Sequence, residues 1–140
     1  MMYNFQQVIH VQTIHKGLSD ITSDVENVVK DSKISCGICN IFVKHTSASL
    51  VIQENTDHRV LDDLNSFLDR IVPEKGFNYT HTIEGPDDMP SHIRSALTSS
   101  SEQIPINNGV LLLGIWQAIY LWEHKNKGKQ RNVVIHIFGK

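Results

Sequence analysis

The 140-residue sequence has little charge imbalance and no long apolar segment. Its 13 Lys and Arg against 15 Asp and Glu give a net charge of -2 with the histidines neutral. A dedicated nucleic-acid-binding domain usually has a strongly basic face, so this balance argues against that class. The longest apolar stretch, residues 109–122, is interrupted by Gln117 and is too short to cross a bilayer. We therefore expect neither nucleic acid nor a membrane as a partner.

Features that would divide or target the chain are also missing. The first residues, MMYNFQQVIH, lack the basic start and continuous apolar core of a secretory signal peptide, so we expect a cytoplasmic protein. The sequence contains no repeat, low-complexity tract or linker. Since 140 residues are enough to bury one core, we expect a single domain over residues 1–140.

Cysteine is scarce, and the only two, Cys36 and Cys39, form a C-x-x-C. A redox pair of this type needs its first cysteine at a helix start, which stabilises the thiolate. Here the following residues, NIFVKH, are typical of a strand, where positions i and i+3 point to opposite faces. We therefore expect neither a disulfide nor a shared metal. A Gly-rich phosphate-binding loop is also absent.

Apolar periodicity predicts strands and helices in alternation along the first half of the chain. Residues 5–15 alternate as one strand. Residues 21–31 carry an apolar stripe at helical spacing, with Ser23 and Glu26 placed as a capping box. Leucines at helical spacing predict a second helix over residues 57–71.

The second half of the chain reads mainly as strands after a short helix from Pro90 to Leu97. The resulting order, with helices interrupting the first half and strands filling the second, predicts an α+β domain with a mostly antiparallel sheet or sandwich covered by helices. The remaining strands are expected at 37–44, 49–53, 103–106, 110–114, 116–123 and 132–138, with a loop over 124–131.

Three of the eight histidines stand out by their neighbours. His45 begins HTSAS between two predicted strands, and His81 and His92 flank the turn TIEGPDDMPS. Neutral imidazole is the commonest protein metal ligand, and three imidazoles with one open position form a catalytic zinc pattern. The fold would have to bring them together, because their spacing is not that of a helix-borne site. The other five are expected to be surface or hydrogen-bonded residues: His10, His15, His58, His124 and His136.

Carboxylates near these histidines have two interpretations. Asp87 and Asp88 precede the short helix, where acids favour the helix dipole and cap free amides. They are equally placed to bind a hard cation or to act as a general base beside His92. Glu54, at a predicted strand end, is the second candidate catalytic carboxylate. Hydroxyl groups expected at the same sheet end, as candidates for anion binding, belong to Thr46, Ser47 and Ser49.

Aromatic and basic residues near the C-terminus supply further candidates. Trp116 and Trp122 are six residues apart on a predicted strand, so both should face one side and pack, while Gln117 faces the other. The lysines of the predicted loop either are solvated or bind phosphate. Arg131 borders the last strand, where its guanidinium can be held rigidly for bidentate recognition.

Four motifs occur in one order: HTSASLVIQEN, HTIEGPDDMPSHIRSAL, SEQIPINNGVLLLGIWQAIYLWE and RNVVIHIFG. In these the chain resembles the YjbQ-like family from about Phe5 to Gly139. These small proteins have long been uncharacterised and are often assigned a secondary thiamine-phosphate synthase activity. The resemblance implies a β-sandwich-like α+β domain with about three helices, homotrimers, and a site for metal ions or sulfate-like anions. By position that site would contain His45, Glu54, His81, Asp88, His92, Trp116, Gln117, Glu123 and Arg131.

Two positions of the chain depart from the family pattern. The family usually has Asn at the position of Asp88 and Thr at that of Ile115. Asp88 adds a negative charge that can tighten the binding of a cation or raise the pKa of a neighbouring acid. Ile115 lacks a hydroxyl that would otherwise be available to a substrate.

Three functions remain open. The resemblance implies a transferase that joins a pyrimidine diphosphate to a thiazole phosphate. Its divalent metal, Zn or Mg, would be held by Asp88 or Glu54, with Arg131 on phosphate and Trp116 on a ring. The histidines themselves favour a metal-dependent hydrolase with three imidazole ligands and Glu54 or Asp88 as base. The third is a non-enzymatic homotrimer that binds a metal or a small anion.

Overall fold

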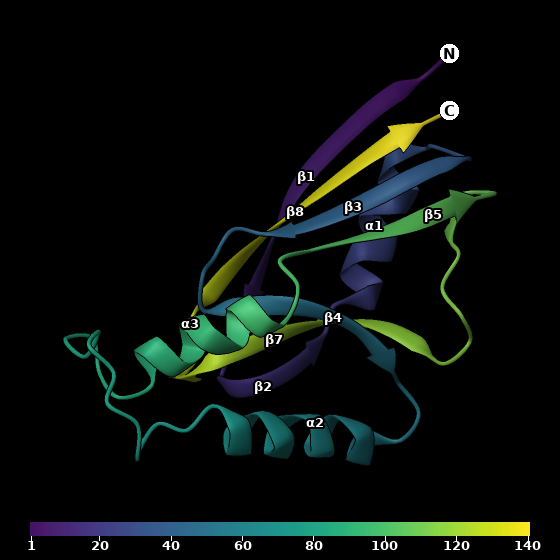
Figure 1. Cartoon of the computed structure of the whole chain (residues 1–140). Coiled ribbons are helices and arrows are strands. Elements are labelled where there is room, and N and C mark those ends of the chain that lie inside the picture. Colours follow the sequence, from purple (N-terminus) through teal and green to yellow (C-terminus); the bar gives the residue numbers. More distant parts are fainter.

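Two antiparallel β-sheets form the framework of the computed structural model, which describes residues 1–140 (Figure 1). The larger sheet, sheet A, has the order β1-β8-β3-β5-β6, and the smaller, sheet B, has the order β2-β7-β4. With three helices, this confirms the predicted α+β class. The strands are β1 (Tyr3–Gln12), β2 (His15–Asp20), β3 (Gly37–Val43), β4 (Ala48–Glu54), β5 (Ser101–Asn107), β6 (Val110–Leu111), β7 (Gln117–Lys127) and β8 (Gln130–Gly139).

The three helices lie on different sides of the sheets (Figure 1). Helix α1 (Thr22–Ser32) buries Val25, Val28 and Val29 beside sheet A, while α2 (His58–Ile71) and α3 (Asp88–Leu97) lie along sheet B. None of the three helices is long and apolar enough to span a membrane.

The main core is a cluster of 18 buried apolar residues shared by both sheets and α1. Its central members, including Ile41 of β3, Leu50 of β4 and Ile135 of β8, are at most 1% exposed. Each such side chain contributes about 1.5–3 kcal/mol by leaving water. Cys39 of β3 belongs to this core, whereas Cys36 precedes the strand and is exposed, and both are free thiols.

The chain passes from one sheet to the other at two neighbouring points. Strand β1 ends before Thr13 and β7 ends before Gly128, and these segments are joined by hydrogen bonds from Thr13 N to Lys129 O (3.0 Å) and from Gly128 N to Ile14 O (2.9 Å). A Cβ at Gly128 would lie 2.0 Å from Thr13 O, so only glycine permits this approach. The double crossing fixes how the ends of the two sheets meet.

Two sequence predictions fail at this crossing. Residues 5–15 form parts of two strands, and the predicted loop over residues 124–131 is almost entirely strand, with only 128–129 between β7 and β8. The polar sequence HKNKGKQR indicates solvent exposure, but His124, Lys125 and Arg131 are all buried. Their polar groups find partners inside the fold, a pairing that the local pattern does not reveal.

Helix and strand boundaries also need correction. The predicted helix over residues 57–71 is confirmed, with Asp57 accepting a hydrogen bond from Arg59 N. The capping box is wrong, because α1 has Ile21 at its N-cap and no side-chain cap bond. Helix α3 begins two residues before Pro90, and β6 ends at Leu111, short of the predicted strand end.

The predicted tryptophan pair is wrong as well. Trp122 lies within β7, is 4% exposed, and donates from Nε1 to Asn65 of α2. Trp116 precedes β7 and is 56% exposed. The strand therefore starts too late to carry both rings on one face.

His124 is the one core histidine, although its sequence position indicated an element end. Its Nε2 hydrogen-bonds with the Ser49 hydroxyl (2.8 Å), while its buried Nδ1 has no partner. Burial, reinforced by the positive charge of Arg94, lowers the pKa of His124 from 6.5 to about 3. The ring is therefore neutral in the folded protein over the physiological pH range.

We predict an acid destabilisation that depends on His124. The unfolded chain protonates this imidazole below about pH 6.5 while the folded chain does not, so stability is lost as pH falls through that value. The loss approaches about 1.4 kcal/mol per pH unit for one group. Urea denaturation between pH 7 and 5 should give a shallower pH dependence for His124→Gln than for wild type. His10→Gln, on the surface, is the control, and equal slopes for all three proteins would contradict the prediction.

Candidate functional site

Two histidines and one aspartate meet at the start of α3. The Asp88 Oδ2 atom lies 2.6 Å from His81 Nε2 and 3.1 Å from His92 Nε2. One donor atom from each of the three residues falls within 4.8 Å of the others, close enough to share an ion. His92 reaches the group because it is four residues after Asp88 on the helix, and His81 returns to it through the turn containing Gly85, whose φ is 106°. We call these three residues the His–Asp cluster.

Lys125 of β7 binds the Asp88 carboxylate at the oxygen that does not contact the histidines. The Lys125 ammonium is 2.9 Å from Asp88 Oδ1 and 3.0 Å from Asp87 Oδ1, and Asp87 Oδ2 accepts from Asn126 N at 2.9 Å. The hydrogen bond from Lys125, against the opposing effect of burial, and then His81, keep the pKa of Asp88 well below its usual range. Asp88 is therefore ionised, with one oxygen fixed by Lys125 and the other turned toward the two imidazoles.

The backbone before β4 orients the second imidazole. His92 Nδ1 lies 2.9 Å from the carbonyl oxygen of Thr46, which can only accept, so Nδ1 carries a proton. This leaves His92 Nε2 as the atom available to a metal, the usual role of a second partner behind a ligating histidine. The side chains of His81 and His92 are 42% and 32% exposed, so an ion has access from solvent.

A polar depression of about 510 Å³ opens beside the cluster, and none of its ten lining residues is hydrophobic. Lys44 and Lys129 supply positive charge at its wall, and neither forms a salt bridge with a carboxylate. Glu84 lies on the same wall, with no hydrogen-bond partner for its carboxylate. The depression therefore places two lysines without carboxylate partners next to the His–Asp cluster, and we call it the basic depression.

His45 lines this depression but is not part of the His–Asp cluster. Its Nε2 accepts a hydrogen bond from Asn132 N at 2.8 Å. Burial, followed by the positive charge of Arg131, lowers the pKa of His45, so the ring stays neutral. The structure thus assembles two imidazoles and a carboxylate, whereas the histidine pattern alone predicted three imidazoles.

The Arg131 guanidinium is held rigidly as expected, but a buried carboxylate of the same chain holds it rather than a ligand. Its guanidinium, 2% exposed, donates to both carboxylate oxygens of Glu123, including Nε to Oε1 at 2.7 Å, and to Ser47. Burial would raise the pKa of Glu123, but the hydrogen bonds from Arg131 and Thr13 outweigh it and lower that pKa. Most donors of Arg131 are therefore committed to the fold, and the lysines that line the depression are the cations without a carboxylate partner there.

Glu54, Trp116 and Gln117 lie at the opposite end of sheet B. Glu54 pairs with Gln117 where β4 ends, and Asn55 N donates to Trp116 O. Because β4 spans seven residues, this end is about 20 Å from the residues that precede the strand. Within one chain, these three residues do not reach the His–Asp cluster.

Sequence reasoning missed the carboxylate of Glu84 and the role of Lys125 as the anchor of Asp88. Lys125 lies in a segment of alternating lysines whose sequence is typical of a solvated loop, so the neighbouring residues do not indicate that its side chain is buried. The adjacent pair of Asp87 and Asp88 was the available signal, because two acids brought into a fold need a cation or another partner.

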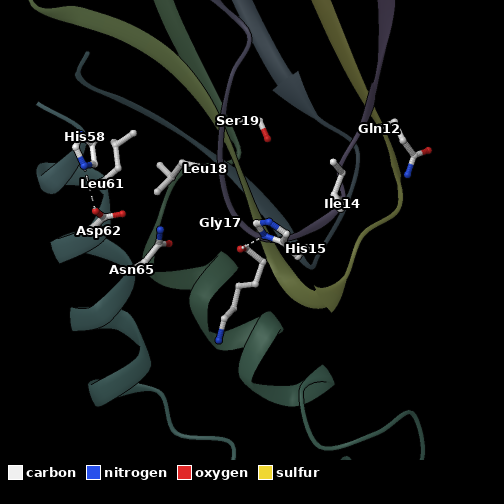
Figure 2. A pocket seen from close by; sticks show the side chains of 11 residues that line it. Gln12, Ile14, His15, Gly17, Leu18, Ser19, His58, Leu61, Asp62 and Asn65 are labelled. Atoms are coloured by element: carbon white, nitrogen blue, oxygen red, sulfur yellow. Dashed lines mark hydrogen bonds and ion pairs between the residues drawn. The ribbon is translucent and has the colours of Figure 1, made fainter. Parts of the chain in front are cut away.

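A separate hollow of about 350 Å³ lies between β2 and α2 (Figure 2). His15 and His58 both line it, but Figure 2 shows them on different walls, pointing to different partners. His58 faces Asp62 of its own helix at 4.0 Å, and His15 hydrogen-bonds the Lys16 carbonyl. The hollow therefore has histidines without the convergence seen at the His–Asp cluster.

The fold and the site together define a two-sheet α+β domain with a polar cluster at one end of its smaller sheet. The chain belongs to the UPF0047 YjbQ-like family, whose model matches residues 7–140. This confirms the resemblance carried by the four motifs.

Relatives and solved structures agree with that assignment. The chain is 50% identical to a UPF0047 protein of Synechocystis sp., covering 96% of this chain and 92% of that protein, and 35% identical to YjbQ of Escherichia coli O157:H7, covering 97% and 99%. The structure matches a protein of unknown function from Sulfolobus solfataricus P2 with a TM-score of 0.92, at 27% identity over the full length of both chains. It also matches an uncharacterized conserved protein from Clostridium acetobutylicum with a TM-score of 0.86, at 36% identity over 94% and 98% of the two chains.

We predict that Arg131→Met destabilises the protein by about 3–5 kcal/mol, because it leaves the buried Glu123 charge unpaired. Urea denaturation measures this loss. The double variant Arg131→Met/Glu123→Gln should recover part of it, since no buried charge then lacks a partner. If the single variant changed only anion binding and left the free energy of unfolding within 1 kcal/mol, Arg131 would be a ligand-binding residue.

Proposed function

We propose that the protein binds a divalent transition-metal ion at the His–Asp cluster and uses it to hydrolyse a small phosphorylated molecule. The observation that supports this most strongly is the convergence of His81, Asp88 and His92 donor atoms within 4.8 Å. Two imidazoles and one carboxylate suit Zn²⁺ or a similar ion better than Mg²⁺, which prefers oxygen ligands. Three protein ligands leave positions open for water and substrate.

The surroundings of the cluster support an anionic substrate. Lys44 and Lys129 line the adjoining depression, which contains no apolar side chain. A phosphoryl group placed there would lie next to the ion, whose charge stabilises the negative charge that develops during P–O cleavage. An ion held by the cluster would supply a bound water as the nucleophile toward phosphorus. Glu84, which lines the depression and has no hydrogen-bond partner, would take the proton of that water as the bond to the leaving alcohol breaks.

The positions of the other candidate residues favour hydrolysis over the synthase reaction. Glu54 and Trp116, expected to hold metal and ring in a thiamine-phosphate synthase, lie at the far end of sheet B. Hydrolysis needs an ion, a water, a base and positive charge for the anion. The His–Asp cluster offers the ligands for the ion, and Glu84, Lys44 and Lys129 of the depression offer the base and the positive charge.

Zinc titration of the metal-stripped protein by calorimetry tests the proposal. We predict about one equivalent bound by the wild type, weakened about 100-fold or more in His81→Ala and His92→Ala, because each removes one of three protein ligands. The zinc affinity of Asp88→Asn should lie between those of the wild type and the two histidine variants, because asparagine keeps an oxygen ligand but loses the negative charge. Mg²⁺ should bind more weakly than Zn²⁺.

His58→Ala is the matched control, because its side chain is 85% exposed and lies outside the cluster. Circular dichroism should show all variants folded. Equal loss of zinc in His58→Ala, or no zinc binding by the wild type, would overturn the metal site. Zinc binding without release of inorganic phosphate from any of a panel of phosphomonoesters would overturn the hydrolase.

A further inference from the structure

A hollow of about 470 Å³ with aromatic side chains in its lining adjoins the His–Asp cluster at His81 and shares no lining residue with the basic depression. Its lining includes His81 itself, together with Phe77, Tyr79, Pro86 and Met89. His81 therefore belongs both to the cluster and to the lining of this hollow. The His81 ring lines this hollow and the His92 ring lines the basic depression, and the two ring centroids are 5.5 Å apart.

The aromatic wall is fixed before any ligand arrives. The Tyr79 hydroxyl donates to the Pro73 carbonyl at 2.6 Å, and Phe77 packs on Tyr79 with ring centroids 4.7 Å apart. Asn126 ties the loop to the end of β7 by donating from Nδ2 to Glu74 at 2.9 Å and from its backbone to Asp87. A preformed wall binds a ligand without the entropic cost of ordering it.

Phe77 is the unexplained member of this wall. It lies on a loop and is 65% exposed, although its ring packs against Tyr79 at a tilt of 41°. The hollow lies in the range of size that small-molecule sites occupy, and such sites combine aromatic walls with a few polar groups. Here the polar lining consists of Glu74, Asn78 and Thr82 together with His81, whose ring also belongs to the His–Asp cluster.

We propose that the hollow binds a planar ring of the same substrate whose anionic group occupies the basic depression. The substrate class is then an aromatic or heteroaromatic compound carrying a phosphoryl group, with the bond to be cleaved at the ion. This rests on the proposed function for the position of the phosphoryl group. Charge complementarity fixes the orientation, because Lys44 and Lys129 lie on the depression side and the aromatic side chains on the other.

Phenylphosphonate and methylphosphonate form a matched probe pair, because they share a headgroup that cannot be hydrolysed and differ only in the ring. With the zinc-loaded full chain, calorimetry should show phenylphosphonate binding about 3- to 10-fold more tightly, the gain typical of one aromatic contact. Phe77→Ala should make the affinities for the two phosphonates equal, and Phe77→Trp should keep the difference. Phe67→Ala, which removes a 61% exposed ring from α2, is the control and should keep it too.

The outcomes separate this inference from the proposed function. Equal affinity for both phosphonates on a zinc-loaded protein would overturn the ring site and leave the metal site standing. If no zinc binds but phenylphosphonate still binds more tightly than methylphosphonate in a Phe77-dependent way, the result would support the ring site and contradict the metal site. A change in oligomeric mass in Phe77→Ala with no change in the ratio would show that the wall is a contact between copies of the chain, which also overturns the proposal.

Discussion

The buried ammonium of Lys125 is the interaction on which the site depends. It lies between the carboxylates of Asp87 and Asp88, at 3.0 and 2.9 Å, and thereby fastens the first turn of α3 to β7. Without a cation, two adjacent partly buried carboxylates would repel each other and hold protons. With it, Asp88 stays ionised and presents its second oxygen to His81 and His92. The sheet therefore determines the charge and the orientation of the cluster.

A second buried ion pair, between Glu123 and Arg131, supports the same end of the molecule. It joins β7 and β8 near the point where the chain passes from sheet B to sheet A. The Thr13 hydroxyl, from the segment between β1 and β2, donates to Glu123 at 2.6 Å. Buried pairs of this kind add little net stability over apolar contacts, but breaking one is costly. Their value here is positional, because they hold the walls of the basic depression rigid beside the exposed imidazoles.

The sequence was informative where a signal is local. Periodicity identified α2 and the central strands, and the turn between His81 and His92 marked the residues that converge. It was uninformative where partners are distant in the chain. The polar run from His124 to Arg131 reads as a loop, since its pairing with Asp87, Asp88 and Glu123 exists only in the fold. Likewise, no local pattern shows that Glu54 and Trp116 lie a strand length from His45, at the opposite end of sheet B.

We propose that His81, Asp88 and His92 form one metal site. Anomalous diffraction at the zinc edge, from crystals grown with one equivalent of zinc, tests it most directly. We predict a single peak about 2.0–2.2 Å from His81 Nε2, His92 Nε2 and Asp88 Oδ2, with the Lys125 ammonium still bound to Asp88 Oδ1. Zinc at His45 or at the surface histidines instead, with the Asp88 carboxylate still hydrogen-bonded to both imidazoles, would contradict it.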